Sequence, residues 1–271
     1  MNSAHQGSER TAQTSASLDY TADKQSERIA KVLARAGVCS RRDAERWIAD
    51  GRVSVDGSIL STPAVTVSAA NDIRVDGKPL PAPERPRLWR FHKPPGLVTS
   101  HRDEKGRPTV FDALPKDMPR LISVGRLDLN SEGLLLLTND GELARRLELP
   151  STGWLRRYKV RVHGQIEPER FAPLERGITV DAVAYGPIRA RLERQQGSNA
   201  WIGIALREGK NREVRRVLEH LGLQVTRLIR LSFGPFHLGN LARGAVEEVP
   251  KKVLTEQLGA ARPTAHADRR R

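Results

Sequence analysis

The sequence predicts an α+β protein in which a small N-terminal domain is linked to a larger domain with a mainly antiparallel mixed sheet and flanking helices. From Leu88 onward, short apolar runs alternate with turns that contain Gly or Pro, as is typical of antiparallel strands with one polar face. Helical patterns interrupt these runs, which favours α+β over an all-β fold. A segment with four prolines in nine residues, 79–87, lies between the two parts and favours extended backbone.

The composition of this segment and of the two ends gives the domain boundaries. Residues 1–24 are rich in Ser, Thr, Ala and Gln and lack periodicity, so we expect a disordered leader. The small domain then covers residues 25–78, the Pro-rich linker 79–87 and the large domain 88–258. Residues 259–271 end in three arginines and are expected to form a disordered basic tail.

Capping residues and turns predict the elements of the small domain. Apolar residues recur at helical spacing from Ile29 to Ala36, and Gly37 is a typical C-terminal stop. Ser40, with Asp43 three residues later, is expected to form the capping box of a second helix. Short strands are expected at 53–55 and 73–75, each before an Asp-Gly turn.

The elements of the large domain follow from its apolar runs and helical patterns. Strands are expected at 97–99, 121–124, 134–137, 158–162 and 200–206. Helices are expected at 141–149, 168–175, 212–221 and 250–258.

Composition and charge narrow the function classes. The chain has 46 Lys and Arg against 32 Asp and Glu, a formal net charge of +14, which makes nucleic acid the leading partner class. Its one cysteine, Cys39, excludes an internal disulfide and a multi-Cys zinc site, and the seven histidines show no metal-ligand spacing. No apolar run reaches the roughly 18 residues of a membrane span, and the polar N-terminus predicts no secretory signal. We therefore expect a cytoplasmic protein with no membrane partner and no metal.

Three arginines lie near the start of the second predicted helix. Arg41 and Arg42 occupy its first turn, where cations oppose the helix dipole, and Arg46 follows one turn later on the same face. A phosphate bound there would attract both the guanidiniums and the helix N-terminus. An ordinary solvated helix face explains the same pattern, but we expect Arg41, Arg42 and Arg46 to bind RNA.

The small domain resembles an S4 RNA-binding domain. The resemblance rests on three pieces in the expected order, namely Glu27-Arg28-Ile29-Ala30-Lys31-Val32-Leu33, Cys39-Ser40-Arg41-Arg42-Asp43-Ala44 and Gly51-Arg52-Val53-Ser54-Val55-Asp56-Gly57.

The most informative stretch of the large domain is 125–141, a polar loop followed by a wholly apolar strand and an Asn-Asp-Gly turn. A loop between two buried strands is held rigidly, which suits a catalytic group. Asp128 lies in this loop between two leucines, and Glu132 and Asp140 follow. From the residues alone, Asp128 is a loop-capping residue, a nucleophile or one half of an acid pair.

This stretch resembles the signature loop of the RsuA/RluB/RluE/RluF family of pseudouridine synthases, whose pattern is G-R-L-D, then a small polar residue, then G-L-L-L-L-T-x-D-G. Within that family, the chain looks most like the enzyme of large-subunit ribosomal RNA. Further matching motifs cover most of the chain between Ser26 and Val249; they are Lys93-Pro94-Pro95-Gly96-Leu97, Arg107-Pro108-Thr109-Val110, Arg156-Arg157-Tyr158-Lys159-Val160, Glu208-Gly209-Lys210-Asn211-Arg212-Glu213-Val214-Arg215-Arg216 and Leu228-Ile229-Arg230-Leu231-Ser232-Phe233-Gly234-Pro235.

The resemblance implies an isomerase that converts a uridine of RNA to pseudouridine. It implies one catalytic aspartate, Asp128, acting as a nucleophile toward the sugar or as a base at C2′, with no redox cofactor because the reaction adds no atom and removes no electron. An ionised carboxylate among leucines needs a nearby cation, and Arg215 matches the family in that role. A solvated, RNA-facing edge formed by Arg212, Arg215 and Arg216 is the plainer interpretation.

Four further residues match family positions around the substrate. Tyr158 matches the aromatic residue that packs on the target base, and Arg126 resembles the residue that replaces the extruded nucleotide. Leu228 is expected to support the pocket. Lys93 is expected either to contact RNA phosphate or to hold its loop, and we assign it to RNA binding. Ser131 stands where the family commonly has Thr and is expected to make the same loop hydrogen bond.

Two other functions compete with the isomerase. One is a non-catalytic ribosome assembly factor that binds RNA through the S4 module, and the other is a glycoside hydrolase with Asp128 and Glu132 as its acid pair. The chain has only 12 aromatic residues in 271, fewer than a sugar-binding surface usually presents. We therefore expect a monomeric enzyme whose partner is large-subunit ribosomal RNA, free or in an assembling particle, and which needs no small-molecule cofactor.

Overall fold

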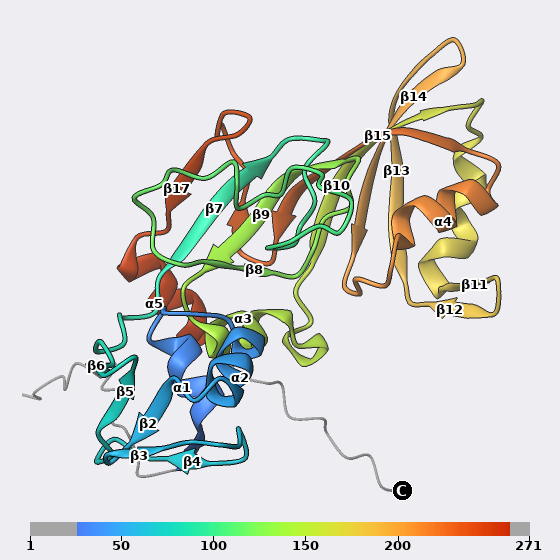
Figure 1. The fold of residues 1–271 in the computed structure, drawn as a ribbon. Coiled ribbons are helices and arrows are strands. Elements are labelled where there is room, and N and C mark those ends of the chain that lie inside the picture. The colour runs from blue at the N-terminus through green and yellow to red at the C-terminus, as the bar shows by residue number, and fades with distance from the viewer. Residues whose placement is uncertain (1–25, 261–271) are drawn as a thin grey trace, which may run out of the picture.

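The computed structural model describes residues 26–260 and has an α+β fold, which confirms the predicted fold class (Figure 1). The predicted leader, 1–24, and most of the predicted tail, 259–271, lie outside the described residues. No helix within the described residues is long and apolar enough to cross a membrane.

The N-terminal part consists of two helices packed on short strands. Its elements in chain order are β1 (Glu27–Arg28), α1 (Ile29–Arg35), α2 (Arg41–Ala49), β2 (Val53–Val55), β3 (Ser58–Ile59), β4 (Thr66–Val67), β5 (Ile73–Val75) and β6 (Lys78–Pro79). Strands β3, β2, β5 and β6 form an antiparallel sheet in that order, and β1 pairs with β4. The predicted helices and both predicted strands are present. Residues 80–87, within the Pro-rich segment, form no helix or strand.

The start of α2 follows the predicted capping box. The backbone N–H of Asp43 donates to the Ser40 hydroxyl at 3.0 Å, and the backbone N–H of Ser40 donates to the Asp43 carboxylate at 3.4 Å. Ile29, Leu33 and Ile48 are fully buried between the helices and strands. These contacts fix α2 with Arg41 and Arg42 in its exposed first turn.

The larger part is built on one nine-stranded sheet with the order β13-β14-β10-β15-β9-β7-β17, to which β16 and β8 add at β15 and β9. Its strands are β7 (Leu88–Lys93), β8 (Ile122–Val124), β9 (Ser131–Thr138), β10 (Arg156–His163), β13 (Ile188–Gln196), β14 (Asn199–Leu206), β15 (Gln224–Phe233), β16 (Phe236–His237) and β17 (Val246–Glu248). The other elements are α3 (Gly141–Glu148), η1 (Pro150–Thr152), η2 (Pro168–Arg176), the hairpin β11 (Ile178–Val180) and β12 (Val183–Tyr185), α4 (Glu213–His220) and α5 (Lys251–Ala260).

Among the described strands of this sheet, only β9 and β15 pair in parallel. Ser131, Glu132 and Gly133 lie opposite Leu228, Ile229 and Arg230. At Gly133, with φ of +103°, an added Cβ would lie 2.4 Å from the backbone oxygen of Arg230, so only glycine fits there. The pairing therefore holds the start of β9, and the loop before it, against the middle of β15.

Each half of the sheet packs helices on an apolar face. Val160, Ile202 and Leu228 belong to a core that η2 and α4 cover on one side of β10, β13, β14 and β15. Figure 1 shows α4 and the β11–β12 hairpin on that side of β13 and β14. At the other half, Leu134 and Leu136 of β9 pack with α3 and α5.

Two predicted elements are corrected. Residues 97–99 form no strand, because Val98 makes an isolated bridge with Thr109 in an irregular segment between β7 and β8. The segment 168–175 is a 3₁₀ helix rather than an α-helix, and it contains Pro173, which lacks the N–H that an α-helix requires. The helix predicted at 250–258 is α5, which continues to Ala260.

Candidate active site

Three successive backbone carbonyls at the centre of the loop between β8 and β9 accept hydrogen bonds. Leu127 accepts from the Thr99 hydroxyl at 2.8 Å, and Asp128 accepts from the N–H of Ser131 at 3.0 Å. Leu129 accepts from the N–H of Gly96 at 2.8 Å. Because each of these carbonyls has a donor, the backbone that carries the Asp128 side chain is fixed.

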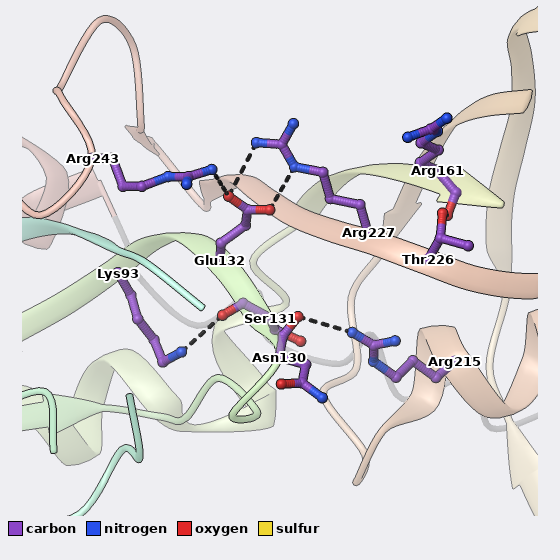
Figure 2. A network of polar contacts seen from close by, with 9 residues as sticks. All are labelled: Lys93, Asn130, Ser131, Glu132, Arg161, Arg215, Thr226, Arg227 and Arg243. Atoms are coloured by element: carbon purple, nitrogen blue, oxygen red, sulfur yellow. Dashed lines mark hydrogen bonds and ion pairs between the residues drawn. The ribbon is translucent and has the colours of Figure 1, made fainter. Parts of the chain in front are cut away.

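Lys93 lies beneath this loop, and the prediction that it contacts RNA is wrong. Its side chain is fully buried, so no phosphate reaches it. The ammonium donates to the backbone oxygens of Pro94 and Leu129 at 3.0 and 3.3 Å. It also donates to the backbone oxygen of Ser131 at 2.8 Å (Figure 2). Burial lowers the pKa of Lys93 to about 8, while the negative charges of Asp128 and Glu132 act in the opposite direction. The structure thus gives Lys93 the second role that the sequence left open, which is to hold the loop.

The Asp128 carboxylate is one-third exposed, and its ion-pair partner is Arg212, with Nη1 3.8 Å from Oδ2. Arg215, the cation expected in that place, is buried and donates instead to the backbone oxygens of Asn130 and Val225, at 3.1 and 3.3 Å. Burial lowers the pKa of Arg215, and the charge of Asp128 opposes this effect. Besides Lys93, two cations therefore serve the loop; Arg212 pairs with the carboxylate, and Arg215 fixes the backbone beside it.

The Asp128 side chain lines a cleft of about 280 Å³, together with Arg126, Tyr158 and Leu228. Leu228 is buried, Tyr158 is half-buried and Arg126 is exposed at the cleft edge. The structure thus brings these four predicted site residues together, whereas Arg215 does not line the cleft. Five cations border the cleft, namely Arg126, Arg156, Lys210, Arg212 and Arg230, against three carboxylates, Asp128, Glu148 and Glu213.

Strand alternation explains why Tyr158 faces Asp128. Tyr158 lies opposite Arg230, and Val160 opposite Leu228, so all four share one face of the sheet. Arg157 and Arg161 point to the other face, as the alternation in the sequence predicts. Arg230 is buried, donates to the backbone oxygen of Leu134 at 2.7 Å and lies below Tyr158.

Three buried polar atoms of cleft-lining residues have no hydrogen-bond partner among the described residues. They are the Ser131 hydroxyl, Oε1 of Glu213 and Nη2 of Arg230. The loop hydrogen bond expected of Ser131 is therefore not made, because the backbone, Thr99, Lys93 and Arg215 already satisfy the loop. A buried polar group without a partner costs stability, so these atoms suit a ligand with both donors and acceptors.

Glu132 follows the cleft-lining Ser131 on β9, so strand alternation points its side chain to the other face. Figure 2 shows Glu132 with Arg227 and Arg243, on the other side of the strand from Lys93 and Arg215. Its carboxylate accepts from Arg227 at 2.6 and 3.1 Å and from Arg243 at 2.8 Å, and these contacts lower its pKa. Asp140, the other nearby carboxylate, caps α3 by accepting from the N–H of Leu143 at 2.6 Å. Neither can form an acid pair with Asp128, which argues against the glycoside hydrolase.

The predicted RNA-binding arginines of the N-terminal part are all exposed. Arg41 and Arg42 make no ion pair with any described residue, whereas Arg46 pairs with Asp43. Arg41 and Arg42 are therefore more available than Arg46 to bind a phosphate.

Sequence reasoning missed Arg212 and Arg230 as site residues. Arg230 could have been found, because strand alternation places it on the same face as Leu228. Arg212 could not, since it adopts the left-handed conformation, with φ of +52°, at the start of α4, and nothing in the local sequence requires this. Within the described residues, no group of three or more His, Cys, Asp or Glu side chains could hold a metal ion.

Comparisons with known proteins agree with this arrangement. Residues 87–220 match the family model of RNA pseudouridylate synthases, and residues 27–73 match that of the S4 domain. An uncharacterized RNA pseudouridine synthase of Rickettsia felis is 46% identical over 228 residues, 84% of this chain and 99% of the relative. A ribosomal large subunit pseudouridine synthase B of Yersinia pestis is 44% identical over 236 residues, 83% of this chain and 73% of the relative. A crystal structure of a pseudouridylate synthase, 26% identical, matches with a TM-score of 0.59 over 84% of this chain and 98% of that one.

Proposed function

This chain belongs to the RNA pseudouridylate synthase family and is an RNA-binding isomerase, and we propose that it converts one uridine of large-subunit ribosomal RNA to pseudouridine with Asp128 as its catalytic residue. The observation that carries the proposal is the position of Asp128. Its carboxylate projects from a hydrogen-bonded loop into a cleft with an aromatic side chain on one wall and a guanidinium 3.8 Å away.

The chemistry requires the C1′–N1 bond to break and a C1′–C5 bond to form. In one form of the reaction, the ionised Asp128 carboxylate attacks C1′ and uracil leaves with the electrons of the broken C1′–N1 bond; after uracil has turned, C5 attacks C1′ and the carboxylate leaves. In the other form, Asp128 removes the proton at C2′ as uracil leaves with those electrons, and returns it to C2′ when C5 bonds to C1′. In both forms C5 then loses its proton and N1 gains one. Both forms need a charged carboxylate held near the ribose, which Arg212 supports by its charge and the fixed loop by its geometry.

The target base must leave the RNA stack to reach Asp128. The ring of Tyr158 offers a face on which uracil can pack before and after it turns, since aromatic stacking is worth about 1–3 kcal/mol and tolerates rotation. Arg126, exposed at the cleft edge, is placed to fill the gap that the flipped nucleotide leaves, which offsets part of the unstacking cost of a few kcal/mol. The unpaired atoms of Ser131, Glu213 and Arg230 suit the alternating donors and acceptors of a uracil edge.

The name of the Yersinia pestis relative supports the large ribosomal subunit as the source of the substrate. We propose that the enzyme acts as a monomer. We place it in the cytoplasm, where bacterial ribosomal RNA is made. The domain limits that we propose remain 25–78 for the S4 domain and 88–258 for the catalytic domain.

A non-catalytic assembly factor is the alternative, and the intact cleft does not favour it. The experiment that separates the two is a map of pseudouridines in ribosomal RNA from cells with and without the gene. We expect one large-subunit site to disappear in the deletion and to return when the purified protein is added to that RNA. Identical maps would overturn the isomerase and favour the assembly factor.

A further inference from the structure

The sheet face opposite the cleft carries a dense group of cations. Lys159 and Arg161 point there from β10 together with Arg157, and the other cations of this basic face are Arg189, Arg191 and Arg194 of β13 and Arg227 of β15. Between β10 and β13, strand β14 contributes Gly203 and Ala205 together with the half-buried Trp201. The helices η2 and α4 pack on the other side of the same strands. Among the described helical residues, Thr152 of η1 and Gln257 of α5 lie near the Arg157 end of the basic face.

Most of these cations are not neutralised by the protein. Lys159 lies 3.5 Å from Glu193 of β13, and Arg227 pairs with Glu132, which reaches this face from the neighbouring strand β9. The remaining five, Arg157, Arg161, Arg189, Arg191 and Arg194, make no ion pair with any described residue. By contrast, η2 and its N-cap on the other side carry three glutamates and two arginines. The basic face therefore carries more positive charge than the η2 surface on the other side of the same strands.

The arrangement is unfavourable for the protein alone. Arg161 lies directly opposite Arg227 in the β10–β15 register, and like charges at such positions destabilise a sheet. Successive cations on one strand are about 7 Å apart, and β10 and β13 are separated by about 10 Å. A polyanion lying across the strands would turn this repulsion into attraction, because its phosphates would meet several guanidiniums at once.

The face is suited to phosphates rather than to bases. Proteins that hold single-stranded RNA stack successive bases on aromatic side chains. Among the described residues of β10, β13, β14 and β15, Trp201 is the only aromatic one on this face, and Lys159 lies 5.2 Å from its ring centre. Double-stranded RNA is recognised mostly by shape and by phosphate and ribose contacts, which a surface of arginines can supply. At the Arg157 end the surface deepens into a cavity of about 340 Å³, which Arg157 and Arg207 line.

We propose that this basic face of β10, β13, β14 and β15 binds the phosphate backbone of a double-stranded segment of the substrate RNA, away from the uridine in the cleft. The inference rests on the proposed function for the identity of the RNA, but the contact is separate from the chemistry. It gives the enzyme a second contact with RNA structure beyond the target nucleotide.

The test compares two double variants that remove the same charge from opposite sides of β13. Arg189→Gln with Arg191→Gln alters the basic face, and Arg170→Gln with Arg176→Gln alters exposed arginines of η2 on the other side. A labelled RNA duplex of about 16 base pairs, the length that a double-stranded RNA-binding domain spans, is titrated at several salt concentrations. We expect the first variant to lower the log–log salt slope by about 2, and the control to keep the wild-type slope.

Two further measurements distinguish duplex binding from a folding defect and from damage to the cleft. Arg189→Lys with Arg191→Lys restores charge and is expected to recover most of the slope, which a folding defect would not allow. All variants are expected to keep wild-type kcat on a short single-stranded RNA that contains the target uridine. Equal slopes for the two Gln variants, or an equal loss with a single-stranded probe, would overturn the duplex site. A wild-type enzyme that binds the duplex through this face but forms no pseudouridine would leave the site standing and overturn the proposed function.

Discussion

The buried ammonium of Lys93 donates a hydrogen bond of 2.8 Å to the backbone oxygen of Ser131, at the junction between the catalytic loop and β9. Because the same ammonium also bonds to Leu129, it fixes the loop just beyond Asp128. A lysine is rarely buried without a carboxylate beside it, since losing hydration costs free energy. Three backbone oxygens compensate here, so the site depends on a charge that never meets solvent.

Replacing Lys93 with Met is expected to slow catalysis without weakening RNA binding. The substitution keeps the length and apolar stem but removes all three hydrogen bonds, so the loop loses its fixed position. A misplacement of about 1 Å can cost about 100-fold in rate, and we expect kcat to fall by that order while KM changes little. Single-turnover pseudouridine formation measures the rate. The exposed Lys105→Met is the control, and wild-type kcat in Lys93→Met would contradict the positioning role.

The same variant tests the pKa of Lys93 through stability. The pKa is about 8 in the folded protein and about 10.4 in the unfolded chain, so between these values the unfolded chain binds more protons at this residue. The free energy of unfolding of the wild type, relative to Lys93→Met, should therefore rise with pH above 8, by about 3 kcal/mol in total, and be flat below it. Urea unfolding at successive pH values measures the difference. Parallel curves for the two proteins would show that Lys93 is not held at a lowered pKa.

Asp128→Asn is expected to abolish pseudouridine formation and to leave RNA binding nearly intact. The amide keeps the shape of the side chain but can neither attack C1′ nor accept a proton from C2′. We expect a loss of about 1,000-fold or more in kcat, as for other essential catalytic groups. Product is counted by pseudouridine-specific chemistry, with the exposed Asp117→Asn as the control. Turnover near the wild-type rate would remove Asp128 from the mechanism.

Substitutions of Arg212 and Arg215 are expected to differ in their effects on kcat and on the free energy of unfolding. Arg212 is nearly half exposed and touches the loop only through the Asp128 carboxylate, so Arg212→Gln should lower kcat and change the free energy of unfolding by less than about 0.5 kcal/mol. Arg215→Gln should lower both, because it weakens the hold on two backbone acceptors and costs about 1–3 kcal/mol. Thermal or urea unfolding beside kinetics distinguishes them. Equal stability losses would contradict the roles assigned to the two arginines.

The sequence predicted the parts of the site that depend on motif order and strand alternation. Asp128, Tyr158 and Leu228 line one cleft because β10 and β15 alternate in register, and that alternation is visible in the sequence. The capping box of α2 was equally readable, because Ser40 and Asp43 act within one turn.

The prediction failed where burial and tertiary contacts decide. Lys93 lies on the same face of β7 as the buried Trp89 and Phe91, and this spacing would have placed its side chain in the interior. Lysines are so seldom buried, however, that the sequence favoured an exposed side chain. Arg212, rather than Arg215, pairs with Asp128 because of a left-handed residue at the start of α4, which no local pattern specifies. Glu132 lies only four residues after Asp128, which suggested an acid pair, yet strand alternation turns its side chain away from the cleft.

The last prediction concerns the S4 domain. Arg41 and Arg42 are exposed in the first turn of α2, where each opposes the helix dipole at a cost of about 0.3–1 kcal/mol. Replacing both with Ala should therefore stabilise the protein slightly while weakening its binding to ribosomal RNA. The log–log salt slope should fall by about 0.7–0.9 for each phosphate that the protein no longer neutralises. The Arg170→Gln, Arg176→Gln protein again serves as the control, because it lowers the net charge equally on a different surface. An unchanged slope, or weaker binding that accompanies a lower stability, would show that these arginines act on the fold and not on phosphate.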